Sequence, residues 1–146
     1  MKIPNYDTKK NGKQNRKLNN LLDEDHRMLI TGQSKCGQTN SLMHMLRMPL
    51  VYYDKIYLHT PNQHQDKIQD LEKIMDKISD KVGYPVLEIG SADNIKDTSE
   101  YPDNGRKLVI FDDLVKPPDK IQNKIANHFT EGRHHKITPI YLTQRY

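Results

Sequence analysis

Four short apolar runs, each followed by polar residues, constrain the fold of this chain more than any other feature of its sequence. The runs cover residues 28–30, 55–59, 108–111 and 140–143 and alternate with segments of helical period. Buried strands that alternate with helices are typical of a parallel sheet with crossover connections. The pattern predicts an α/β fold, a mainly parallel sheet flanked by helices, with polar residues at the carboxyl edge where such sheets bind ligands.

Two amphipathic helices and two shorter segments complete the predicted organisation. One helix carries apolar residues every three or four positions, at Ile68, Leu71, Met75, Ile78 and Val82. Another is predicted to begin near Asp119, which would cap it, and to end before Gly132. Residues 86–89 are consistent with a short edge strand. Residues 91–106, rich in Asp, Asn and Ser, predict a long surface loop.

The length and the charge distribution predict one small domain with a basic tail. The 146 residues are 34% hydrophobic, and the single cysteine excludes an internal disulfide. Residues 1–20 hold six Lys and Arg residues against Asp7 alone. We therefore predict a disordered tail over residues 1–22 and a folded core over residues 23–146. The tail could contact phosphates or act as a localisation signal, or it could be a solubilising extension or a mispredicted start.

The hydropathy of the sequence predicts where in the cell the protein is found. No apolar stretch approaches the roughly 20 residues that cross a bilayer, and the first residues lack the apolar run of a signal peptide. We therefore expect a soluble, intracellular protein with no membrane partner.

A glycine-bounded segment between the first apolar run and a predicted helix matches the frame G-x-x-x-x-G-K-[ST], the Walker A motif, with one departure. Such a loop turns backbone N–H groups toward phosphates, and the hydroxyl of Thr39 can ligate magnesium. Gln38 stands where the motif has lysine. The predicted nucleotide-binding residues are Gly32, Gln33, Ser34, Lys35, Cys36, Gly37, Gln38, Thr39 and Asn40.

The substitution at Gln38 removes a positive charge from the predicted phosphate site. At an effective dielectric constant near 20, a cation about 4 Å from a phosphate charge contributes about 4 kcal/mol, roughly a thousandfold in affinity or rate. Lys35 could curl back from within the loop and replace that charge. Alternatively, its side chain points to solvent and the nucleotide site is weakened or inactive.

A second motif follows about 70 residues downstream, where residues 107–113 resemble a Walker B strand. A buried apolar strand would deliver Asp112 to its carboxyl tip, where the carboxylate can hold Mg²⁺. Asp113 could then polarise the attacking water. The alternative is a strand that ends in a simple Asp-Asp turn, which the upstream phosphate loop makes less attractive.

Two further residues are candidates for catalysis. Gln144 ends the fourth apolar run and could sense the γ-phosphate. Arg133 could stabilise charge on a nucleotide of the same chain or of a neighbouring subunit; the alternative is a helix cap in a solvated basic turn. His128, His134 and His135 do not form a zinc site, since neighbouring histidines point in different directions and no cysteine or carboxylate completes a ligand set.

Taken together, the Walker A and Walker B segments and residues 132–144 resemble the genome-packaging ATPases of poxviruses and related large DNA viruses, in the FtsK/HerA superfamily. The resemblance covers roughly residues 26–146. It implies an ASCE-type P-loop NTPase fold that uses ATP and Mg²⁺. It also implies a self-associated ring that moves double-stranded DNA into a capsid, with capsid proteins as partners, in the viral factory of the host cytoplasm or nucleus.

The chain departs from this family at its end as well as at Gln38. Relatives continue beyond the position of Tyr146 into at least one more strand, which would flank the first strand. We therefore expect C-terminal strands to be lacking and the first strand to lie at an exposed edge. A truncated or decaying copy, such as a viral remnant in a host genome, would explain both departures; a full-length product with an altered Walker A motif is the alternative.

Three functions are compatible with these motifs. The leading one is a packaging ATPase. The second is a nonhydrolytic module of the same family that binds nucleotide, DNA or a partner subunit, which Gln38 favours. The third is a small-molecule kinase or a GTPase, but the sequence has neither a base-specificity motif nor an arginine-rich lid.

Overall fold

The computed structural model describes residues 26–33, 40, 43–44, 46 and 53–145. The predicted tail over residues 1–22 lies outside this part of the chain. So do residues 34–39 of the predicted phosphate loop and much of the helix predicted after it.

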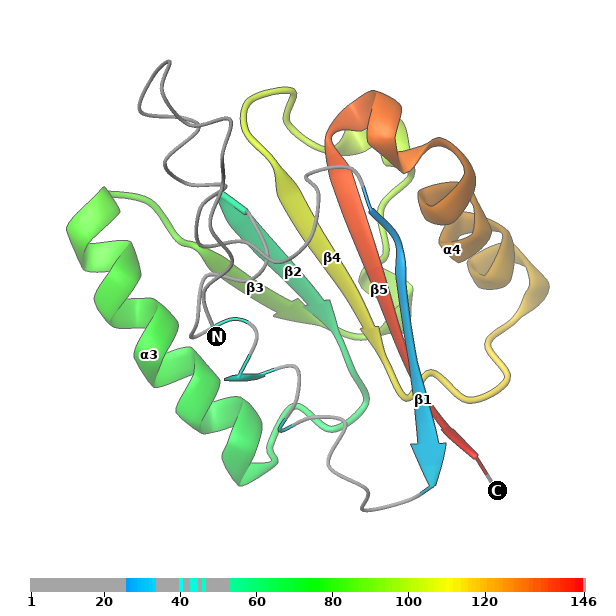
Figure 1. The fold of residues 1–146 in the computed structure, drawn as a ribbon, viewed down its shortest axis with the longest axis horizontal. Coiled ribbons are helices and arrows are strands. Elements are labelled where there is room, and N and C mark those ends of the chain that lie inside the picture. Colours follow the sequence, from blue (N-terminus) through cyan, green and yellow to red (C-terminus); the bar gives the residue numbers. More distant parts are fainter. Residues whose placement is uncertain (1–25, 34–39, 41–42, 45, 47–52, 146) are drawn as a thin grey trace, which may run out of the picture.

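Five strands form one parallel sheet, which confirms the predicted α/β class (Figure 1). The strand order is β1-β5-β4-β2-β3, and every neighbouring pair is parallel. The strands are β1 (Met28–Gln33), β2 (Lys55–His59), β3 (Leu87–Gly90), β4 (Lys107–Asp112) and β5 (Ile137–Arg145). Because all strands run the same way, their carboxyl ends lie along one edge of the sheet.

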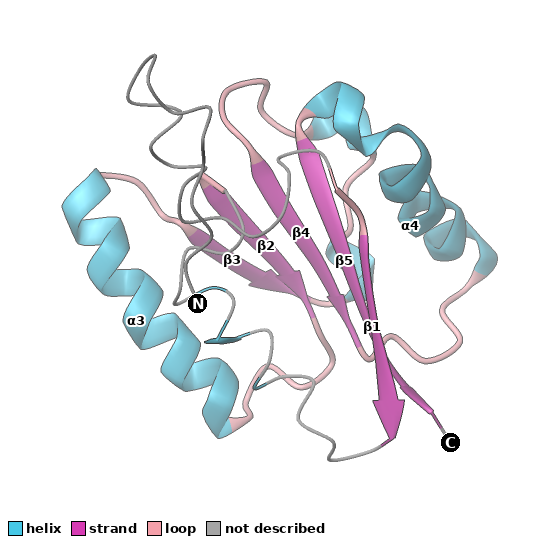
Figure 2. Cartoon of the chain, in the orientation of Figure 1, coloured by secondary structure: helices cyan, strands magenta, loops and turns pink. Residues whose placement is uncertain are grey.

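Helices cover both faces of the sheet, giving three layers (Figure 2). Helix α3 (Asp66–Val82) buries Ile68, Leu71 and Met75 against one face, and α4 (Asp119–Glu131) buries Ile121 and Ile125 against the other. The apolar period of the sequence predicts both helices. Helix α3 ends at Gly83, whose backbone has φ of 84° and whose N–H donates to the carbonyl of Ser79, a conformation that favours glycine.

The two faces hold different cores. The α3 face is mainly aliphatic, because even-numbered residues of β2, β4 and β5 such as Leu58, Ile110 and Leu142 point there. The α4 face is rich in rings: Phe111 stacks on His59 with ring centroids 5.8 Å apart and meets His128 edge-on at 5.2 Å. Within the described residues no helix is both long and apolar enough to span a membrane.

Strand β1 lies at one edge of the described sheet, where β5 is its only described neighbour. This position agrees with the exposed edge that the sequence predicts. Leu29 on this strand is 65% exposed, which is unusual for a large apolar residue of a parallel sheet.

Strand β5 begins earlier than the apolar run alone predicts, and it includes Pro139. Proline cannot donate a backbone hydrogen bond, so it is normally excluded from the middle of a sheet. The carbonyls of Lys136 and Leu142 accept hydrogen bonds from the N–H groups of Lys107, in β4, and Asp113, directly after it. Alternate residues of β5 therefore face β4, and the backbone of Pro139 faces the β1 side. Among the described residues, pairing with β1 starts at Ile140, so no described partner needs the missing N–H.

Two other predictions about local structure are wrong. Asp119 does not cap α4: the cap is Pro118, and Asp119 is the first helical residue. Residues 91–106 are not simply a surface loop. They form two short 3₁₀ turns, η1 (Ala92–Asn94) and η2 (Thr98–Glu100), and bury Ile95 and Tyr101 in the core of the α4 face.

Candidate nucleotide site at the carboxyl edge of the sheet

The carboxyl edge brings together two segments that lie about 80 residues apart in the sequence. Strand β5 separates β1 from β4 and pairs with both. Leu142 of β5 lies opposite Asp112 on one side and opposite Ile30 on the other, and Gly32 lies two residues farther along β1. The tip of β4 and the end of β1, where the predicted phosphate loop starts, therefore both lie at the carboxyl edge of the sheet.

The described residues on either side of the predicted loop are consistent with this arrangement. Gly32 and Gln33 are the last residues of β1, and Asn40 is helical and exposed. Beyond it, Met43 and Leu46 pack on the α3 face in the same core as Ile110 and Leu142. Ser34, Lys35, Cys36, Gly37, Gln38 and Thr39 lie outside the described residues.

Asp112 is the last residue of β4, and its side chain lies on the α3 face. Its Oδ2 accepts a hydrogen bond of 3.0 Å from the hydroxyl of Thr60. Burial raises the pKa of the Asp112 carboxyl, while the hydrogen bond from Thr60 lowers it and the charge of Asp113 raises it further. A carboxylate that is half-buried and held by one neutral donor is suited to a cation that supplies the compensating charge.

Thr60 was not singled out from the sequence, although it is the polar residue that follows the second apolar run. It is fully buried directly after β2, next to β4 in the sheet. The pair His59 and Phe111 is in register, so Thr60 and Asp112 follow as the next pair along these strands. The polar residue at the end of each apolar run is the sequence signal that points to Thr60. Its contact with Asp112 depends on the register between β2 and β4, which the sequence does not specify.

Asp113 has a different environment from Asp112. Its backbone is left-handed, with φ of 54°, a conformation that aspartate tolerates better than most residues. Its N–H donates to the carbonyl of Leu142 at 3.0 Å, which fixes the turn against β5. The side chain lines a cavity on the α4 face, so the two acids lie on different sides of the tip of β4.

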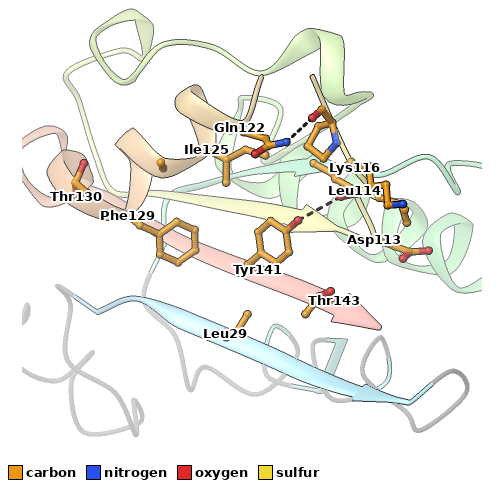
Figure 3. A pocket seen from close by; sticks show the side chains of 13 residues that line it. Leu29, Asp113, Leu114, Lys116, Gln122, Ile125, Phe129, Thr130, Tyr141 and Thr143 are labelled. Carbon is orange, nitrogen blue, oxygen red and sulfur yellow. Dashed lines mark hydrogen bonds between the residues drawn. The ribbon is translucent and has the colours of Figure 1, made fainter. Parts of the chain in front are cut away.

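That cavity has a volume of about 750 Å³ and lies between β1, β5 and α4 (Figure 3). Most of its lining is apolar, including Leu29, Ile125, Phe129 and Tyr141, while Asp113 and Thr143 stand at its carboxyl end. The hydroxyl of Tyr141 donates to the carbonyl of Leu114 at 3.3 Å. Burial, followed by the charge of Asp113, raises the pKa of this tyrosine, so it stays neutral at physiological pH.

The structure separates the two other predicted catalytic residues. Gln144 lies in register with Gly32 at the carboxyl edge. Arg133 lies in the 3₁₀ turn η3 (Gly132–His135), which precedes β5 and is therefore at the opposite, amino-terminal edge. Arg133 is exposed. The predicted role of Arg133 toward a nucleotide of the same chain does not fit this position; a role toward a neighbouring subunit stays a prediction.

His128 belongs to the core. Its Nδ1 donates to the carbonyl of Lys124 at 2.6 Å, and its Nε2 accepts from the hydroxyl of Tyr101 at 2.8 Å. Both ring nitrogens are thus engaged within the protein. The described residues contain no group of three or more His, Cys, Asp or Glu side chains arranged to hold a metal ion.

The donor set at the carboxyl edge suits Mg²⁺ better than a softer metal. Mg²⁺ prefers oxygen ligands and is usually held by one or two carboxylates together with waters and substrate phosphates. Asp112 offers such a carboxylate at the same edge of the sheet as the end of β1, with β5 between the two strands. The residues present therefore fit a magnesium ion that is shared with a nucleotide.

The parallel sheet flanked by helices, with two acids at the tip of β4, is consistent with the P-loop NTPase class. The family model described as "Poxvirus A32 protein" matches residues 13–146. The chain belongs to this family, which is that of the poxvirus genome-packaging ATPases. No curated protein and no solved structure matches the chain significantly.

Proposed function

We propose that this chain is the ATPase of a viral genome-packaging motor, which couples ATP hydrolysis to the translocation of double-stranded DNA into a capsid. The observation that carries the proposal is the shared carboxyl edge, where the end of β1 and the tip of β4 flank β5. Membership of the poxvirus A32 family supports the packaging role.

In this proposal the residues have separate tasks. Backbone N–H groups of residues 32–39 bind the phosphates, and Asp112 and Thr39 hold Mg²⁺. The bound ion would neutralise charge on the β- and γ-phosphates. Asp113 orients and polarises the attacking water, and Gln144, in register with Gly32, contacts the γ-phosphate or that water.

The position of Arg133 favours a motor built from several subunits. In its own chain this residue lies at the edge opposite the acids, so its charge can reach a nucleotide only in a neighbouring copy. We therefore propose a ring in which Arg133 of one subunit faces the nucleotide of the next. Such a ring would act on DNA with capsid proteins as partners, in the viral factory of the infected cell.

A second candidate function is a member of the family that binds nucleotide or DNA without hydrolysis. Gln38 favours it, because glutamine brings no charge to the phosphates. The two candidates differ in a measurable way: the motor turns over ATP with Mg²⁺, and the nonhydrolytic module binds ATP without turnover.

The substitution Gln38→Lys distinguishes the packaging ATPase from the nonhydrolytic module. Restoring the cation should raise Mg²⁺-dependent turnover or nucleotide affinity by up to roughly a thousandfold. Phosphate release and nucleotide affinity should be measured for both proteins, with Lys35→Ala in each background to report whether Lys35 supplies the missing charge. ATP binding that never leads to turnover, even with Gln38→Lys, would favour the nonhydrolytic module; absence of nucleotide binding in both proteins would overturn the proposal.

A further inference from the structure

The hydroxyl of Thr60 both donates and accepts a hydrogen bond. A threonine hydroxyl has one proton to donate and can accept hydrogen bonds at its oxygen. The oxygen accepts the backbone N–H of Asn62 at 3.0 Å, and the proton is donated to Oδ2 of Asp112 at 3.0 Å. The two interactions fix the direction in which this hydroxyl points.

The backbone of Thr60 is fixed as well. Its N–H donates to the carbonyl of Gly90 at 3.0 Å, which ties the residue to the end of β3. Its own carbonyl accepts from Nε2 of Gln63 at 3.4 Å. The side chain is branched at Cβ and fully buried, so it has little rotational freedom. Thr60 is therefore a rigid point to which a neighbouring side chain can be held.

We propose that Thr60 is a positioning residue for the metal ion of the nucleotide site. It holds Oδ2 of Asp112 and leaves the other carboxylate oxygen for the divalent cation. Within the described part of the chain, Thr60 is the only hydrogen-bond partner of this carboxylate. The inference rests on the proposed function, in which Asp112 holds Mg²⁺. Hydrogen bonds to metal ligands orient those ligands, and their loss typically weakens metal binding by roughly 10- to 100-fold.

The chain provides a matched control for this proposal. Thr98 is also buried, and its hydroxyl donates to Oε1 of Glu131 at 2.6 Å. This pair has the same chemistry as Thr60 and Asp112, but it joins η2 to the end of α4, and Glu131 lies next to η3 toward the amino-terminal edge. Removing either hydroxyl should reduce stability, whereas only the loss of the Thr60 hydroxyl should affect the metal.

The experiment compares the wild type with Thr60→Val, Thr60→Ser and Thr98→Val. Mn²⁺ is titrated calorimetrically into each protein, alone and with a saturating non-hydrolysable ATP analogue, and the analogue is also titrated without metal. Thermal melting shows that each variant is folded. Thr60→Val should weaken Mn²⁺ binding roughly 10- to 100-fold and leave the metal-free affinity for the analogue unchanged. Thr60→Ser keeps the hydroxyl and should stay within a few-fold of the wild type, as should Thr98→Val.

The outcomes separate this inference from the proposed function. If the wild type binds Mn²⁺ with the analogue and Thr60→Val binds it equally well, Thr60 has only a structural role and the inference is overturned alone. The inference would also be overturned if Thr60→Val and Thr98→Val lost the same amount of Mn²⁺ affinity. It would be overturned as well if the folded Thr60→Ser variant bound Mn²⁺ as weakly as Thr60→Val. If the folded wild type binds neither the metal nor the analogue, the proposed function fails and the inference fails with it.

Discussion

Asp112 and Asp113 are neighbours in the chain, but the protein surrounds them differently. Asp112 ends β4 on the α3 face and is held by the buried hydroxyl of Thr60. Asp113 has a left-handed backbone and lines the cavity on the α4 face. β4 ends at Asp112, and the left-handed backbone of Asp113 turns the chain there, so this Asp-Asp pair supplies two carboxylates in separate surroundings. The hydrogen bond that holds the Asp112 carboxylate suits the metal ligand that we propose, whereas Asp113 is the acid that we propose to act on the attacking water.

The largest effect is expected from the substitution Asp113→Asn. Loss of a general base or a water-orienting acid typically lowers turnover by about 10²- to 10⁴-fold. Asparagine tolerates the left-handed backbone and occupies the same space, so the fold and the Mg²⁺-dependent nucleotide affinity should be preserved. Phosphate release and nucleotide binding should both be measured, in the wild-type or the Gln38→Lys background. Turnover that survives unchanged in this variant would remove Asp113 from catalysis.

A smaller effect should distinguish the backbones of the two acids. At Asp113 a glycine relieves the left-handed conformation, so Asp113→Gly should be more stable than Asp113→Ala by about 1 kcal/mol. At Asp112 the order should reverse, because glycine weakens a strand by roughly 0.5–1 kcal/mol relative to alanine. Urea unfolding of the four variants measures both differences. The same order at both positions would contradict the assigned backbone conformations.

The smallest expected effect is a pH dependence of the unfolding free energy that comes from histidines on the α4 face. Burial lowers the pKa of His59 and of His128. The unfolded chain therefore binds more protons than the folded one just below the ordinary histidine pKa of 6.5, and stability should fall as the pH falls through that range. Burial raises the pKa of Asp112, so its contribution has the opposite sign at more acidic pH.

Urea unfolding between pH 7.5 and 5.5 measures this dependence. The variant His59→Phe removes one titrating group while keeping a ring beside Phe111. Its unfolding free energy should decline less steeply than that of the wild type as the pH falls. An equal slope in the two proteins would exclude His59 as a source of the effect.

Most of the fold could be predicted because it depends on local patterns. The run at 55–59 gave the bounds of β2, and apolar period placed α3 and α4. The start of β5 could not be predicted in this way. Pro139 is tolerated there because its backbone faces the β1 side of β5, and the described pairing with β1 begins only at the next residue, Ile140. Ile95 and Tyr101 are single apolar residues in a polar segment, without a period to reveal their burial.

The candidate site was predictable only in part, because its contacts depend on strand order and register. Asp112 and Asp113 follow an apolar run and could be found from the sequence. The contact of Thr60 with Asp112 requires β2 to lie beside β4 with His59 opposite Phe111, which no local pattern specifies. The position of Arg133 can be predicted from the sequence, because the residue precedes the fourth apolar run and residues that precede a parallel strand lie at the amino-terminal edge of the sheet.

The central claim is that the end of β1 and the tip of β4 share one metal and nucleotide site. The most direct test is paramagnetic broadening of backbone amide NMR signals by Mn²⁺ bound together with a non-hydrolysable ATP analogue. The amides of Gly32, Asp112 and Thr60 should broaden together while that of Lys136 at the opposite edge stays sharp, and Asp112→Asn should abolish the pattern. Broadening centred on the amino-terminal edge, or on only one of the two segments, would contradict the claim.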